Sequence, residues 1–153
     1  MTAQAKPAAK QYALEISRVV DAPRDVAFNI WTTPDHLARW WGPKDFTSTC
    51  ERLEFRKGGA YRLTIHKGDH HHGMSGVYRE IAVPERIAFT FAWDDESGQP
   101  GHETLIMVTF ETVAERKTRV TFQQAPFADV ETRNSHEAGW GECLDNMEAY
   151  LSL

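Results

Sequence analysis

Apolar residues recur at steps of three and four along the end of the chain, from Asp129 to Leu153. This spacing places the apolar side chains on one face and predicts a single long amphipathic helix. Asp129 stands where an N-cap residue would begin it, at the end where a carboxylate is favourable. At 1.5 Å per residue such a helix is roughly 35 Å long. Its predicted buried face consists of His136, Trp140, Cys143, Leu144, Met147 and Leu151.

The middle of the chain instead alternates between apolar and polar residues, which is typical of strands with one buried face. Turn-forming and charged residues divide this region into short segments. Because the connections are short, successive strands should pair as antiparallel neighbours. The sequence predicts six strands here, at residues 47–55, 60–66, 73–83, 86–94, 103–113 and 118–125. Residues 67–72, which include three consecutive histidines, are predicted to form a polar loop.

A further alternating segment, Tyr12–Asp21, predicts a strand at the start of the domain. Pro23 and Pro34 then stand near the first turns of two short helices, where proline is well tolerated. The predicted order is therefore one strand, two short helices, six strands and one long helix. We expect an α+β fold, in which a curved antiparallel sheet grips the C-terminal helix and encloses a central cavity.

Composition limits the classes of protein that the chain can represent. Its 153 residues fit one domain, predicted at residues 12–153, after a flexible N-terminal tail at residues 1–11. A net charge of −5 without a basic block argues against a nucleic-acid partner. No apolar run reaches the roughly 20 residues of a membrane span. Two isolated cysteines favour a reducing cytoplasm. We also expect a monomer or a homodimer.

Several short motifs follow one another in a fixed order. They are Ala22-Pro23-x-x-Val26, Pro34-x-x-Leu37-x-x-Trp40-Trp41-Gly42-Pro43, Gly58-Gly59-x-Tyr61, Gly76-x-Tyr78-x-Glu80-Ile81, Pro84-Glu85-Arg86-Ile87 with Phe89-Thr90, and Gly139-Trp140-x-x-x-Leu144. In this order the chain from Tyr12 onward resembles the START-like (SRPBCC, helix-grip) superfamily. Within it, the chain is similar to the single-domain bacterial type of the activator of heat shock protein 90 ATPase homologue family.

The resemblance implies a fold and a pocket, and it includes no catalytic motif. Members of the superfamily bind lipids, polyketides or hormones, which implies a small apolar or aromatic ligand between the sheet and the C-terminal helix. Eukaryotic members of the family contain a co-chaperone module, so a chaperone-interacting module is the alternative function. A cyclase- or hydrolase-like enzyme acting on a bound hydrophobic substrate is the second alternative. We expect binding rather than catalysis, and no cofactor.

Large aromatic residues are the main candidates for a ligand site, because such sites are mainly apolar with a few placed polar groups. Most of the aromatic residues should form the core. Those near the short helices, the sheet and the long helix are the best candidates for a lining. The predicted ligand-binding residues are Trp40, Phe89, Phe91, Trp93, Val108, Phe122, Gln124, His136 and Trp140.

Two polar groups offer other chemistry. Residues His70–His72, near His66 and Asp69, are of the types that bind zinc or nickel. Consecutive side chains point in different directions, however, so we expect a solvated loop and no metal. His136 is a candidate general base, since its charge can change near neutral pH. In a cyclase- or hydrolase-like enzyme it could act with one carboxylate. A hydrolytic pair of carboxylates is also possible among Glu51, Glu80 and Glu103, but nothing in the sequence sets their separation.

Overall fold

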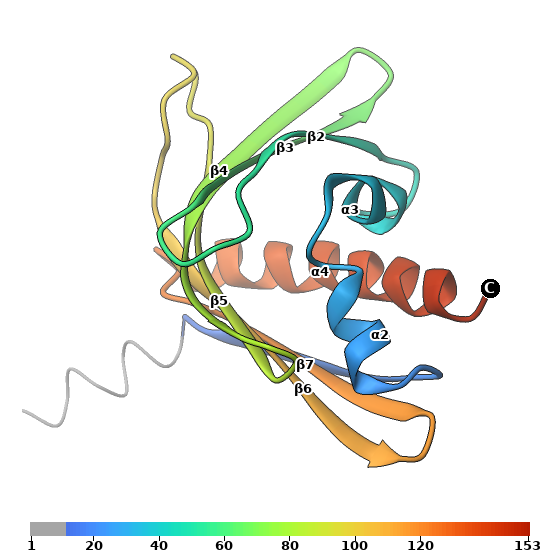
Figure 1. The fold of residues 1–153 in the computed structure, drawn as a ribbon. Helices are drawn as coiled ribbons and strands as arrows, with labels where there is room; N and C mark the ends of the chain where they lie inside the picture. The colour runs from blue at the N-terminus through green and yellow to red at the C-terminus, as the bar shows by residue number, and fades with distance from the viewer. Residues whose placement is uncertain (1–11) are drawn as a thin grey trace, which may run out of the picture.

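The computed structural model describes residues 12–153, so the predicted tail at residues 1–11 lies outside the described residues. An antiparallel sheet of seven strands curves around one long helix, and two short helices lie on the open side of the curve (Figure 1). The predicted α+β fold class and the order of the elements are confirmed.

The elements follow the predicted order. The first part of the chain forms β1 (Leu14–Val20), α2 (Arg24–Asn29), α3 (Pro34–Trp40), β2 (Thr47–Leu53) and β3 (Ala60–Lys67). The second part forms β4 (His70–Ala82), β5 (Arg86–Trp93), β6 (Thr104–Ala114), β7 (Lys117–Ala125) and α4 (Val130–Leu151). The sheet order is β1-β7-β6-β5-β4-β3-β2, so β2 to β7 form consecutive hairpins and β1 adds next to the last strand.

Alternation along the strands determines which side chains face the helix. On β6, Ile106, Val108 and Phe110 are buried, and Val120 and Phe122 of β7 lie beside them. The central strand, β5, differs because both of its faces are buried, including the small residues on the convex side. The residues on that side, Ala88, Thr90 and Ala92, are small and at most 4% exposed.

The sheet bends where its strands contain irregularities. The register shifts at Cys50/Arg52, Tyr78/Glu80 and Thr112/Ala114. Such bulges increase local twist and bend a strand. Beside the second of them, a Cβ at Gly76 would collide with the backbone carbonyl of Thr90. Glycine is therefore required where β4 approaches β5 this closely.

The start of β4 differs from the prediction. The histidines at 70–72 do not form a loop; they are the first residues of the strand and pair with Lys67, His66 and Ile65 of β3. The connection shrinks to a two-residue turn at Gly68-Asp69, with Gly68 at φ +60°. Glycine at the first central position suits a tight hairpin turn. The polar residues of this segment suggested a loop. They form a strand that remains polar because the tip of the hairpin extends into solvent.

The long helix begins as the sequence predicts. Asp129 is the N-cap, and its side chain accepts a hydrogen bond from the Thr132 amide at 2.7 Å. Of the predicted inner face, Trp140, Cys143, Leu144 and Met147 are buried, whereas His136 and Leu151 are half-buried. The helix thus packs against the sheet through its middle, and its first turns contribute to a more open region.

Candidate functional site

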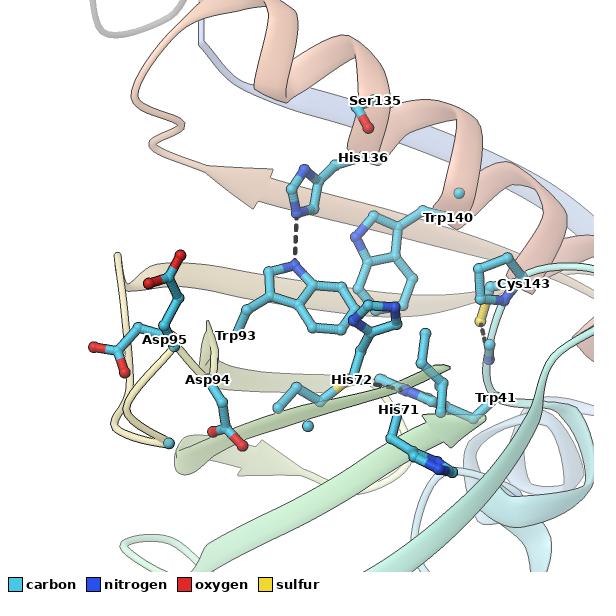
Figure 2. Close-up of a pocket in the computed structure, with 18 residues that line it drawn as sticks. Trp41, His71, His72, Trp93, Asp94, Asp95, Ser135, His136, Trp140 and Cys143 are labelled. Atoms are coloured by element: carbon cyan, nitrogen blue, oxygen red, sulfur yellow. Dashed lines mark hydrogen bonds between the residues drawn. The ribbon is translucent and has the colours of Figure 1, made fainter. Parts of the chain in front are cut away.

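A cleft of about 820 Å³ lies between α4 and the half of the sheet formed by β3, β4 and β5. Ser135, His136, Gly139, Trp140 and Cys143 of α4 line one side of it. The other sides come from the segment after α3, the tip of the β3–β4 hairpin and the loop after β5 (Figure 2). This volume falls within the range of pockets that hold small molecules.

Three tryptophans form the apolar walls of the cleft. Trp41 meets Trp140 edge to face, with ring centroids 5.2 Å apart and an interplanar angle of 82°. Trp93 packs against Phe91 at 5.3 Å, and Phe91 packs against Trp140 at 5.7 Å. Because each ring is held by another ring, the walls keep their orientation without a ligand.

His136 stands above Trp93 and holds its indole in place (Figure 2). The indole N–H of Trp93 donates to Nε2 of His136 at 2.9 Å, and Nδ1 of His136 lies 2.8 Å from the Thr132 carbonyl. A carbonyl can only accept and an indole N–H can only donate, so the imidazole is neutral with its proton on Nδ1. Both ring nitrogens are occupied, which leaves His136 without a lone pair for a substrate.

The thiol of Cys143 lies at the inner end of the cleft and is unreactive. The Gly42 amide donates to its sulfur at 3.3 Å, in a turn where Gly42 adopts φ +108°. Burial, opposed by this hydrogen bond, raises the pKa of Cys143 to about 12. A neutral thiol at ordinary pH is a poor nucleophile, so the cleft lacks a thiolate for covalent catalysis.

Acidic residues form the outer rim of the cleft. Asp94 forms an ion pair with Arg62, which passes over Gly73. The Asp95 carboxylate accepts hydrogen bonds from the Ser97 hydroxyl and from backbone amides of its own loop, and these lower its pKa. Glu96 is exposed beside them. The lining therefore has three carboxylates and contains neither lysine nor arginine, which disfavours an anionic ligand.

The structure brings together three of the predicted ligand-binding residues in the cleft, namely Trp93, His136 and Trp140. Phe89 lines a separate small void instead. The other predicted residues lie in the packed core: Trp40, whose indole donates to the Ile30 carbonyl, together with Phe91, Val108, Phe122 and Gln124, whose amide nitrogen donates to Thr104.

Sequence reasoning missed the other lining residues, above all Trp41, His72 and Met74. Trp41 follows the last residue of α3 in extended backbone, so helical periodicity did not indicate where it would point. His72 faces the cleft because it pairs with Ile65 on the inner face of the sheet (Figure 2). Side chains two residues apart on a strand share a face, so His72 faces the same way as Met74. The predicted strand began at residue 73, so it left His72 out.

Trp41 also separates the cleft from the interior. Behind it lies a void of about 10 Å³, lined by Trp31, Leu37, Tyr61 and other apolar residues. Among residues 12–153, the buried indole nitrogen of Trp31 has no hydrogen-bond partner. A void of this size holds at most one water molecule. Aromatic rings therefore fill the centre of the fold, and a ligand beneath α4 would lie in the side cleft.

The three carboxylates considered for a hydrolytic pair lie elsewhere. Glu51 accepts from the Thr64 hydroxyl at 2.7 Å, Glu80 pairs with Arg86, and Glu103 is exposed before β6. None of the three lines the cleft. Within residues 12–153, no group of three or more His, Cys, Asp or Glu side chains is arranged to hold a metal ion.

A curved antiparallel sheet closed over one long helix, with a cleft beside that helix, defines the START-like helix-grip class of proteins. Residues 21–152 match the family described as activator of Hsp90 ATPase homolog 1-like protein. The chain belongs to this family, as its motifs predicted. In the part that the structure describes, no helix is both long enough and apolar enough to cross a membrane.

Solved structures show the same fold. A protein from Arthrobacter aurescens is 27% identical, with a TM-score of 0.84, and the match covers 94% of this chain and 87% of that one. A protein from Chromobacterium violaceum is 22% identical (TM-score 0.83; 93% and 99% covered), and one from Silicibacter pomeroyi is 23% identical (TM-score 0.83; 92% and 97% covered). No curated protein matches this sequence significantly.

Proposed function

We propose that the chain binds a small molecule with a flat apolar or aromatic body in the cleft beneath α4. The observation on which this proposal depends is the cleft of about 820 Å³ walled by Trp41, Trp93 and Trp140. Indole faces offer large, rigid contact areas to planar rings. Because ring-to-ring packing already orders these walls, a ligand loses little free energy in arranging them.

The charge of the lining narrows the ligand class. With carboxylates at the rim and no lysine or arginine in the lining, the site favours neutral or amine-bearing molecules over carboxylates and phosphates. Indole faces also attract organic cations, by roughly 0.5–2 kcal/mol. A planar ring system with an amine should therefore bind more tightly than the same ring system with a carboxylate.

A matched pair of glycines in α4 tests this proposal. Gly139 lines the cleft, and a Cβ added there meets no atom within 4 Å; one added at Gly141 meets only Arg18, at 3.8 Å. Gly139→Leu should place a side chain inside the cleft and weaken binding at least tenfold. Gly141→Leu should leave binding unchanged on the same helix. Tryptophan fluorescence titrations and ligand-induced thermal shifts, with matched amine and carboxylate ring compounds, measure both. Equal binding by all three proteins would overturn the proposal.

The family match supports a second candidate, a module that interacts with an Hsp90-type chaperone. The description of the family names activators of Hsp90 ATPase, and the match covers residues 21–152. If this function holds, the purified chain should co-elute with an Hsp90-type chaperone and raise its rate of ATP hydrolysis. Gly139→Leu should then have no effect, which separates surface recognition from binding in the cleft.

A further inference from the structure

The histidines at the β3–β4 hairpin are divided between the two faces of the sheet. Because β4 begins at His70, successive side chains alternate. His72 faces the cleft, whereas His71 points to the opposite side of the strand (Figure 2). There His71 lies directly across from His66 of β3. His71 borders the cleft, but its imidazole is directed away from it and toward His66 (Figure 2).

The two imidazoles are in direct contact. Nδ1 of His66 lies 2.7 Å from Nδ1 of His71, and the ring centroids are 4.9 Å apart. On the other side of the His66 ring, Nε2 lies 3.0 Å from the Thr49 hydroxyl of β2. In this contact the Nδ1 of one ring donates a hydrogen bond and the Nδ1 of the other accepts it. Thr49 engages the far nitrogen of His66 and so directs Nδ1 towards His71.

We propose that His66 and His71 form a binding site for a divalent transition-metal ion of the Cu²⁺ type. The hydrogen-bonding proton leaves to solvent, and both rings turn so that their Nδ1 lone pairs converge on an ion beside the line between the two nitrogens. Metal–imidazole bonds are about 2.0 Å long, so two cis ligands of a square-planar ion lie about 2.8 Å apart. Tetrahedral zinc requires about 3.3 Å. The observed 2.7 Å is close to the square-planar value.

The surroundings leave room for the metal's other ligands. His71 is exposed and His66 is half-buried, so water can complete the coordination sphere. The Glu51 carboxylate of β2 already accepts a hydrogen bond from the Thr64 hydroxyl at 2.7 Å, so we do not count it as a metal ligand. The pair supplies two protein ligands, and we expect exchangeable binding in the order Cu²⁺ > Ni²⁺ > Zn²⁺, because both affinity trends and spacing favour copper.

Cu²⁺ titration of the chain without an affinity tag, followed by calorimetry, tests this site. His66→Ala and His71→Ala should each weaken Cu²⁺ binding at least tenfold. His70→Ala is the matched control, since His70 is on the same hairpin but faces the other side of the strand, and it should change binding less than twofold. Electron paramagnetic resonance of the Cu²⁺ complex should show two imidazole nitrogens, and one in either single variant.

Two outcomes would overturn the site. If Cu²⁺ binding is the same in His66→Ala and in the unchanged chain, the contact is only a hydrogen bond between two rings. If Zn²⁺ binds more tightly than Cu²⁺, the square-planar assignment is wrong. Circular dichroism of each variant confirms that the hairpin substitutions leave the fold intact.

Discussion

The two sides of Trp140 meet different environments. Toward β7, its ring lies 4.5 Å from the ring of Phe122, within a buried core that also includes Leu144 and Met147. Toward β4, the same residue faces the cleft together with His72 and Met74. Strand alternation directs side chains inward on both halves of the sheet. The halves differ because neighbouring side chains fill the space on one of them, while the acidic loop after β5 only borders it on the other.

The largest expected effect lies on the filled side. Leu144 is fully buried, so Leu144→Ala should lower the free energy of unfolding by about 2–5 kcal/mol through lost burial and a residual cavity. Urea denaturation measures the loss. Leu151→Ala, near the half-buried end of the same helix, should cost clearly less. Equal losses would show that α4 is not anchored through its middle.

The next prediction concerns Cys143, at the boundary between core and cleft. Its pKa is about 12 in the folded chain and 9.0 ordinarily, so the neutral thiol stabilises the fold below pH 9. As pH rises from 9 towards 12, the unfolded chain releases this proton first. Stability should therefore fall by roughly 1 kcal/mol per pH unit. Urea midpoints across this range, with Cys143→Ala as the reference, measure it; an equally steep decline in the variant would assign the effect to other groups.

A smaller effect is expected on the cleft side, at the hydrogen bond between Trp93 and His136. Trp93→Phe removes the donor and His136→Ala removes the acceptor. A double-mutant cycle should give a coupling energy of about 1 kcal/mol, typical of one hydrogen bond. A coupling near zero would mean that the indole is not held in solution, and the cleft would then lack a fixed wall.

The smallest effect comes from the glycines of α4. Gly139→Ala and Gly141→Ala should each raise the free energy of unfolding by up to about 1 kcal/mol, because alanine favours a helix and neither new Cβ collides with another atom. Thermal unfolding measures the gain. A stabilising change at Gly141 and a destabilising one at Gly139 would show that the cleft closes over Gly139 in solution.

Much of this architecture could be predicted because it follows from local periodicity. Strand alternation accounts for the inward direction of Ile106, Val108 and Phe122, and steps of three and four predicted Trp140 and Leu144 on the buried side of α4. Asp129 marked the start of the helix by its capping chemistry. These signals depend on backbone geometry alone, which repeats every two residues in a strand and every 3.6 in a helix.

Periodicity could not say which inward residues remain uncovered. Phe122 and Trp93 both face the helix, but Phe122 is buried against α4 while Trp93 is half-buried in the cleft. That difference depends on the acidic loop, the hairpin tip and the turn at Gly42, which are distant in sequence and meet only in three dimensions. For the same reason the three histidines gave no hint of the contact between His66 and His71, which arises from strand pairing across a two-residue turn.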